Sequence, residues 1–479
     1  MLNSVIAAGT KTAAAAGARV AAMGGNAVDA AAAAVVASWV CEPGMTAVGS
    51  ALLAMVRPAG QEAMLVDGLT VMPGLGGHRG EPAGGSRITM PYGPGVETGV
   101  GPASVAVPGG PAALELLQQR WGRLSWAEVM GPAIRLAAEG FPYPEVSASY
   151  LPISGECIYD LTEGGRRIWR FPDGRPRQVG DVTVLPELAA DLQMIADEGA
   201  SVLYTGSLGE RIGDWMVEHG GALSRQDLMA YQPLVRVPRQ ANDQGWSVWT
   251  SDTIGGDALL EMVAGFSKIP PEGEAEARLL VEVMMTTLRR RDDRLRGASA
   301  STTQICAVDE TGCACSVTTS TGYGSGVVVP GTGIMLNNML GELELLPHGP
   351  YVLKPGERLP SNMTPMIAVR DESVVALGAA GADRIAPAIA QTWRGIVARE
   401  ASVSASVDAP RFYVRDASGA ATLDFEPGFD PTGVELPLHP FDERHMYFGG
   451  VQAAALCADG SLAGGGDPRR GGATETCSP

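Results

Sequence analysis

The chain has 479 residues, 45% hydrophobic and 18% charged, so it is long and apolar enough to bury large cores. Its 35 basic and 53 acidic residues give a net charge of −18, which disfavours nucleic acid and anionic membranes as partners. The seven cysteines form no regular framework and the five histidines show no metal-ligand spacing. We therefore expect neither a disulfide-stapled secreted protein nor a bound metal or other cofactor.

The first forty residues show two helical patterns, 12–23 and 27–40. Between them, Gly24-Gly25-Asn26 suits a helix end with positive φ followed by an N-cap. The apolar run 30–40 is shorter than the about 20 residues that cross a bilayer, so it predicts a buried Ala-rich helix. The residues before it lack the basic start of a signal peptide. We expect a cytoplasmic protein without a membrane partner.

Predicted strands at 50–56 and 63–67 come next, followed by a Gly- and Pro-rich segment, 74–110, that predicts an ordered but irregular loop. Helical patterns then dominate to about residue 264, with one strand between them. The helices are expected at 111–120, 126–138, 186–198 and 208–219, and the strand near 246–250. A longer helix over 274–296 ends in Arg289-Arg290-Arg291, which we interpret as a solvated cap that complements the helix dipole.

After residue 300 strand patterns prevail. Two hairpins are predicted, 303–308 with 313–319 and 366–369 with 373–377. A helix over 384–398 follows the second hairpin, and Asp383 is expected to cap it. Gly464-Gly465-Gly466 is expected in a C-terminal loop. Helices around a strand-rich centre predict a layered α/β arrangement, and without a visible linker or repeat we expect one domain over 1–479.

A short run of hydroxyl residues, Ser301-Thr302-Thr303, stands at the start of the first hairpin. Taken alone, such a cluster usually reflects β-propensity. Here it coincides with a wider pattern, because the chain resembles the γ-glutamyltranspeptidase family of N-terminal-nucleophile (Ntn) hydrolases. The matching fragments keep the family order, and the ordered set is specific although each fragment is short. They are 24–31, 42–43, 107–110, 224–231, 254–256, 302–309, 333–338, 363–365, 381–385, 446–450 and 467–470.

The resemblance implies a four-layer αββα sandwich and self-cleavage before a Thr. The cut would fall between Ser301 and Thr302, leaving a large subunit, 1–301, and a small subunit, 302–479, as a heterodimer. A Thr hydroxyl needs a base, and a new α-amino group, with a pKa of about 7.7–8.0, can be that base. Thr302 is thus predicted to be the nucleophile and to carry its own base.

The resemblance also places the other catalytic groups. The family stabilises the oxyanion with two successive backbone N–H groups of a Gly-Gly pair, which match Gly381-Ala382 at the entrance of the predicted 384–398 helix. Ala in the second place keeps the N–H. Ser320 falls where the family has a Thr that hydrogen-bonds the nucleophile, and it keeps the hydroxyl.

The substrate-binding positions depart from the family pattern. In the family an Arg binds the α-carboxylate of the γ-glutamyl group, and in this chain that position is Leu69. An apolar side chain thus stands in place of a charge-assisted contact. Met339 replaces a Gln of the family, and Glu342 replaces the Asp that contacts the α-amino group. The family's pair of serines is replaced by Ser361-Asn362. The family's Asn two residues past the position of Ser320 is deleted in the shortened segment 320–323. The His that follows Thr-Thr in the family is Gln304.

Three functions stay open. The pocket changes favour a self-processing Ntn hydrolase of a non-glutathione, amino-acid-like or peptide intermediate, with C–C cleavage in antibiotic biosynthesis as one form. The alternative is an ordinary γ-glutamyl hydrolase or transpeptidase acting on glutathione-like substrates. The third is a non-catalytic homologue that serves as a binding protein.

Overall fold

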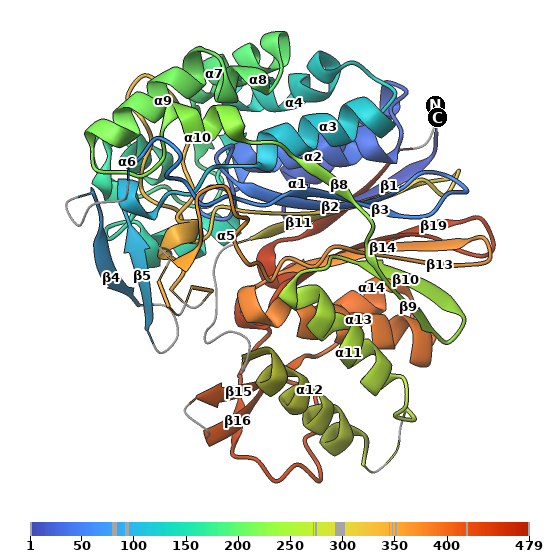
Figure 1. Ribbon diagram of the computed structural model, residues 1–479. Coiled ribbons are helices and arrows are strands. Elements are labelled where there is room, and N and C mark those ends of the chain that lie inside the picture. Colours follow the sequence, from blue (N-terminus) through green and yellow to red (C-terminus); the bar gives the residue numbers. More distant parts are fainter. Residues whose placement is uncertain are drawn as a thin grey trace.

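The computed structural model describes residues 2–78, 84–91, 95–271, 273, 275–292, 302–343, 345–346, 348–349, 352–417 and 420–477. In this part of the chain two large β-sheets lie face to face, and helices cover the outer face of each (Figure 1). The layers therefore run α, β, β, α, which is the sandwich that the family resemblance implies.

The first sheet has the strand order β20-β1-β11-β12-β2-β3-β8, with antiparallel pairing throughout. Its strands are β1 (Ser4–Ala8), β2 (Ala51–Arg57), β3 (Met64–Gly68), β8 (Leu234–Arg236), β11 (Thr303–Asp309), β12 (Ala314–Ser320) and β20 (Ala473–Cys477). Strands from before and after Thr302 are thus interleaved, because β1 lies between β20 and β11.

The second sheet has the order β19-β18-β14-β13-β10-β9. Its strands are β9 (Arg239–Asp243), β10 (Trp246–Thr250), β13 (Met366–Arg370), β14 (Ser373–Ala380), β18 (Gly450–Leu456) and β19 (Leu462–Gly466). Alternate side chains of the two sheets, such as Leu53 and Met55 from the first and Ile367 and Ala376 from the second, form the core between them.

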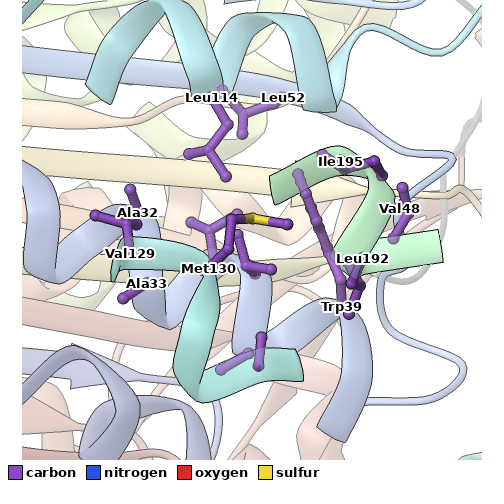
Figure 2. Close-up of a cluster of buried hydrophobic side chains, with 14 of the residues drawn as sticks. Ala32, Ala33, Trp39, Val48, Leu52, Leu114, Val129, Met130, Leu192 and Ile195 are labelled. Carbon is purple, nitrogen blue, oxygen red and sulfur yellow. The ribbon is translucent and has the colours of Figure 1, made fainter. Parts of the chain in front are cut away.

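Helices from the N-terminal half cover the first sheet. They are α1 (Lys11–Ala22), α2 (Ala27–Cys41), α3 (Gly110–Trp121), α4 (Trp126–Glu139), α7 (Pro186–Glu198), α8 (Ser201–Tyr204), α9 (Ser207–Glu218) and α10 (Arg225–Ala230). Every residue of α2 is buried. Figure 2 shows Ala32 and Ala33 of α2 near Val129 and Met130 of α4. The small alanines let the helices approach closely, which explains why so Ala-rich a segment is a central helix.

The second sheet is covered by α11 (Ile254–Phe266), α13 (Ile385–Ala398) and α14 (Val403–Asp408), and α12 (Glu276–Asp292) packs against α11 and β15. Smaller elements lie at the periphery. They are α5 (Glu145–Ser154), α6 (Glu163–Trp169), the hairpin β4 (Ser86–Met90) with β5 (Val96–Val100), the pair β6 (Phe141–Pro142) with β7 (Val182–Thr183), and the sheet β15 (Phe412–Ala417), β16 (Ala420–Phe425) and β17 (Leu438–Pro440). None of the described helices is long and apolar enough to cross a membrane.

The predicted helices and both predicted hairpins are present within one to three residues of the expected bounds where the structure describes them. Two expectations are wrong, because the hairpin β4–β5 lies inside the segment 74–110 and Gly464–Gly466 belongs to β19. Strand β1, which precedes the first helix, was not predicted. A Cβ atom on Gly464 would lie 2.8 Å from side-chain atoms of Val5 and Thr474, so close packing against the first sheet explains this glycine.

Candidate active site

Thr302 stands immediately before β11 and is almost fully buried. In the β11–β12 register Thr303 pairs with Thr319, which sets Thr302 opposite Ser320, the last residue of β12. The Thr302 hydroxyl donates to Ser320 Oγ at 3.3 Å, and Ser320 Oγ also accepts from the Gly322 N–H at 3.1 Å. Ser301, the other side of the expected cleavage site, lies outside the described residues.

Gly381 and Ala382 form a turn between β14 and α13, with φ values of 135° and 65°. A Cβ atom on Gly381 would lie 2.6 Å from Gly449 Cα, so only glycine fits there. Ala382 tolerates its positive φ at a cost of the order of 1 kcal/mol. The turn directly precedes helical residues, whose first N–H groups lack partners within the helix.

Hydrogen bonds of Asp383 with charged and aromatic side chains stabilise the turn at Gly381-Ala382. The Asp383 carboxylate accepts from the Tyr413 hydroxyl at 2.6 Å and from Arg384 at 2.5 Å, and Arg291 donates to the Asp383 backbone carbonyl at 3.2 Å. Burial would raise the pKa of Asp383, but Arg384 and Arg291 together with the Tyr413 hydrogen bond hold it below its ordinary value. The Arg384 guanidinium also lies 4.2 Å from the ring centroid of Tyr447.

Two expectations about this region are therefore wrong. Asp383 does not cap α13, because its carboxylate is taken up by Tyr413 and Arg384, and the N-cap position is Arg384 without a side-chain cap. Arg291 is not solvated, because it is buried beside Asp383. Spacing along α12 could not reveal this, since the partner lies about ninety residues further along the chain.

A pocket opens in front of Thr302, and we call it the front pocket. Its empty space of about 350 Å³ includes open solvent. It brings together Thr302, Ser320 and Ala382 with all five residues that the sequence assigned to substrate binding. The described lining residues are Ala51, Leu69, Thr70, Thr302, Ser320, Met339, Glu342, Leu345, Pro360, Ser361, Asn362, Met363, Ala382 and Ile385. Gly381 is the neighbour of Ala382 and stands just outside this set.

The walls of the front pocket come from loops that are tightly anchored. Leu69 follows β3, and its N–H donates to Asp67 Oδ1 at 2.9 Å. Met339 and Glu342 follow Asn337 and Asn338, which belong to the family-like fragment 333–338 but had no predicted role. Asn337 binds the backbone of Gly49, Ala106 and Met339, while Asn338 binds Thr98, Gly99 and Tyr323. These two amides fix the loop that carries Met339 and Glu342.

Asn362 differs from the other buried amides of the site. Its side chain is 6% exposed, and neither its Nδ2 nor its Oδ1 has a hydrogen-bond partner among the described residues. A buried amide without partners costs free energy unless a ligand or water satisfies it. Asn362 lies on the wall of the front pocket, so a molecule in that pocket is one possible source of the missing hydrogen bonds.

A second pocket, of about 240 Å³, lies on another side of Thr302, and we call it the rear pocket. Its polar lining includes Glu42, Gln304, Gln452 and Arg470. The Arg470 guanidinium donates to the Thr302 carbonyl at 3.4 Å. Burial raises the pKa of Glu42 to about 7, against the hydrogen bonds from Thr303 and Thr10 and the charge of Arg470, which lower it.

Sequence reasoning placed Glu42 and Arg470 in family-like fragments but gave them no role, and only the fold brings them beside Thr302. It grouped Gln304 with the substrate-binding changes, whereas the structure places it outside the front pocket. The Gln304 amide donates to Ser316 Oγ at 2.9 Å and accepts from Thr318 Oγ1 at 2.6 Å, so it serves the sheet core. Within the described ranges no group of three His, Cys, Asp or Glu side chains could hold a metal ion.

Known proteins are similar to this chain over nearly its whole length. The model of the family described as gamma-glutamyltranspeptidase matches residues 13–299 and 296–477. The chain belongs to the γ-glutamyltranspeptidase family. It is accordingly an enzyme of the hydrolase and transferase type that this family represents.

Relatives with two kinds of name are similar over nearly the whole chain. The acylase ACY 1 proenzyme of Pseudomonas sp. (strain SE83) is 28% identical over 94% of this chain and 89% of its own length. The glutathione hydrolase proenzyme of Escherichia coli (strain K12) is 25% identical over 93% and 87%. A crystal structure of cephalosporin acylase from Bacillus halodurans has a TM-score of 0.80 at 25% identity, covering 99% of this chain and 96% of that one.

Proposed function

We propose that this protein is a self-processing Ntn hydrolase in which Thr302 becomes the N-terminal nucleophile. The observation that carries the proposal is the hydrogen bond between the Thr302 and Ser320 hydroxyls, both of which line the front pocket together with Ala382. A nucleophile, its hydroxyl partner and an oxyanion donor are the groups that acyl transfer requires.

The reaction would proceed in two stages. The α-amino group of processed Thr302 takes the hydroxyl proton as Oγ1 attacks the substrate carbonyl, and the N–H groups of Gly381 and Ala382 stabilise the oxyanion. The amine leaves with the proton, and the acyl group stays on Thr302 as an ester. Water then attacks the ester, returns the hydroxyl to Thr302 and releases the acid.

The proposed substrate is an amino-acid-like compound other than glutathione. Leu69 stands where a carboxylate-binding Arg would be needed for a γ-glutamyl group, and Met339 adds another apolar surface. Removing such a contact costs about 10³-fold or more for the original substrate. Among the relatives, the name acylase is compatible with a different acyl group. C–C cleavage in a biosynthetic pathway and a cytoplasmic location stay predictions.

Processing would divide the chain into 1–301 and 302–479, held together as a heterodimer. Each fragment would supply part of the front pocket, because Leu69 comes from the first and Met339, Glu342 and Asn362 from the second. The word proenzyme in the names of both relatives supports a cut.

Denaturing electrophoresis of the purified protein tests the proposal. We expect two fragments from the wild type and one uncut chain from Thr302→Ala. As a control, Thr205→Ala removes an exposed hydroxyl that is not among the described lining residues of either pocket, and it should still allow the cut. An intact wild-type chain without acylase activity would contradict the proposal and favour a binding protein.

A further inference from the structure

The proposed nucleophile and the proposed oxyanion turn belong to different sheets. Thr302 leads into β11 of the first sheet, whereas Gly381 and Ala382 follow β14 of the second. Their separation therefore depends on how the two sheets are placed against each other. A displacement of about 1 Å between reacting groups can cost about 10²-fold in rate. A contact that joins these two segments would thus bear directly on the chemistry.

Arg470 lies where the chain passes from one sheet to the other. It ends the short 3-10 turn η8 (Pro468–Arg470), which connects β19 of the second sheet to β20 of the first. Asp467 anchors this turn, because its carboxylate accepts from the Val451 N–H at 2.8 Å and pairs with Arg411 at 2.6 Å. The Arg470 side chain thus starts from a fixed point between the two sheets.

The Arg470 guanidinium reaches both catalytic segments. Its Nη1 donates to the Thr302 carbonyl at 3.4 Å. A Cβ atom on Gly381 would lie 3.7 Å from its Nη2, which is ordinary van der Waals distance. The stem of the side chain runs along Gly450 at the start of β18, where a Cβ atom would lie 2.7 Å from Arg470 Cδ. Glycine at position 450 therefore leaves room for Arg470 to extend from η8 to both segments.

A counter-charge for Arg470 comes from the other side of the proposed cut. Among the described residues that line the rear pocket, Glu42 is the one acid and Arg470 the one base. Arg470 is 8% exposed, and a buried guanidinium is costly without an opposite charge nearby. The charge of Arg470 in turn lowers the pKa of Glu42, against the larger effect of burial. Glu42 thus helps to keep a cation behind Thr302.

We propose that Arg470 is a positioning residue that fixes the Thr302 nucleophile relative to the oxyanion turn at Gly381-Ala382. The inference rests on the proposed function and adds a residue to its machinery. Arg470 is not among the described residues that line the front pocket. Its loss should therefore slow the chemical step and leave substrate binding nearly unchanged.

Pre-steady-state hydrolysis of p-nitrophenyl acetate by the cut enzyme tests the inference. Thr302 Oγ1 bonds to the acetyl carbon, the ester C–O bond breaks, and coloured p-nitrophenolate leaves, while the hydroxyl proton goes to the α-amino group. We expect a burst of one p-nitrophenolate per wild-type molecule. Varying the ester concentration separates the limiting rate of acylation from the concentration that gives half of that rate.

Three variants change the contacts of Arg470 to different degrees. Arg470→Leu should lower the limiting acylation rate by about tenfold or more, with the half-saturating concentration within about twofold of wild type. Arg470→Lys keeps the charge but lacks the fork that reaches two segments, so its loss should be intermediate. Gly450→Ala keeps Arg470 and displaces its stem, so it too should slow acylation and stays informative if Arg470→Leu fails to fold.

Arg394→Leu is the matched control for a purely structural role. Arg394 is also buried, but it lies in the last half of α13 and donates to the carbonyls of Phe266 and Ile269 at 2.7 and 2.8 Å. Its loss should lower the free energy of unfolding without changing the acylation rate. Urea denaturation of each protein identifies conditions under which all of them are folded, and the kinetics are compared there.

The outcomes separate the inference from the proposed function. A cut wild type with a burst that is unchanged in all three variants overturns the inference and leaves the hydrolase standing. So does a raised half-saturating concentration at an unchanged rate, or an equal slowing in Arg470→Leu and Arg394→Leu. A folded Arg470→Leu chain that stays uncut while Arg394→Leu is cut supports the inference. A cut wild type without a burst overturns the inference alone, and an uncut wild type without a burst overturns both.

Discussion

The two pockets that meet at Thr302 differ in how their polar groups are satisfied. In the rear pocket Glu42 accepts hydrogen bonds from Thr10 and Thr303, while Arg470 contacts the Thr302 carbonyl. In the front pocket apolar residues dominate, and the Asn362 amide has no partner among the described residues. The two pockets thus differ in that the polar groups behind Thr302 are bonded to one another and to its backbone, whereas the amide in front of it is not bonded to a described residue.

The largest expected effect concerns the support of the rear pocket. Arg469, the neighbour of Arg470, is buried and binds Glu426 at 2.5 Å and Asp467 at 3.2 Å. Arg469→Leu would leave two buried carboxylates without this cation, so we expect the free energy of unfolding to fall by about 3–5 kcal/mol. Urea denaturation measures this loss.

The matched control for Arg469→Leu is Arg444→Leu. Arg444 pairs with Asp408, but both side chains are nearly half exposed. Its loss should cost less than about 1 kcal/mol because water screens the pair. If both variants lowered the free energy of unfolding by the same small amount, the buried ion pairs of Arg469 would not stabilise the region around Arg470 and Thr302.

The second effect is a pH dependence from Glu42. Its folded-state pKa of about 7 lies above the ordinary value of 4.5, so the folded protein favours the protonated form. The stabilisation of the folded state by protonated Glu42 is fully present below pH 4.5 and is lost as the pH rises through 7. Between pH 4.5 and pH 8 the free energy of unfolding of the wild type should fall by about 3 kcal/mol more than that of Glu42→Gln.

Urea denaturation at several pH values compares the two proteins. Glu372→Gln, which changes an exposed acid, should follow the wild-type profile. Parallel profiles for the wild type and Glu42→Gln would show that the rear pocket does not favour a protonated Glu42.

The smallest expected effect lies at the junction of the two pockets. Ser320→Ala removes the acceptor of the Thr302 hydrogen bond, which is worth of the order of 1 kcal/mol, so processing and kcat should slow by about fivefold. Ser320→Thr keeps a hydroxyl and should retain the rate. A change in KM alone would assign Ser320 to substrate binding instead.

Much of this arrangement could be predicted from the sequence, because local patterns specify local elements. Periodicity and turn residues predicted α2, α4 and both hairpins, and the ordered family fragments predicted the residues that line the front pocket. Contacts between distant segments could not be predicted in this way. Arg291 looks like an ordinary helix-end cation until α12 packs beside Asp383, and Glu42 has no visible neighbour until Gly9 lets Thr303 approach it.

The strand order of the first sheet has a consequence for refolding. Strand β1 lies between β11 and β20, so each of its two edges is bonded to chain that follows Thr302. Before the proposed cut, these strands are tethered and can find one another again after denaturation. After the cut, reassembly becomes a second-order, concentration-dependent encounter of two fragments with exposed strand edges. The cut enzyme would then be kinetically stable, because it unfolds slowly, and a denatured sample would not regain its folded structure when the denaturant is diluted.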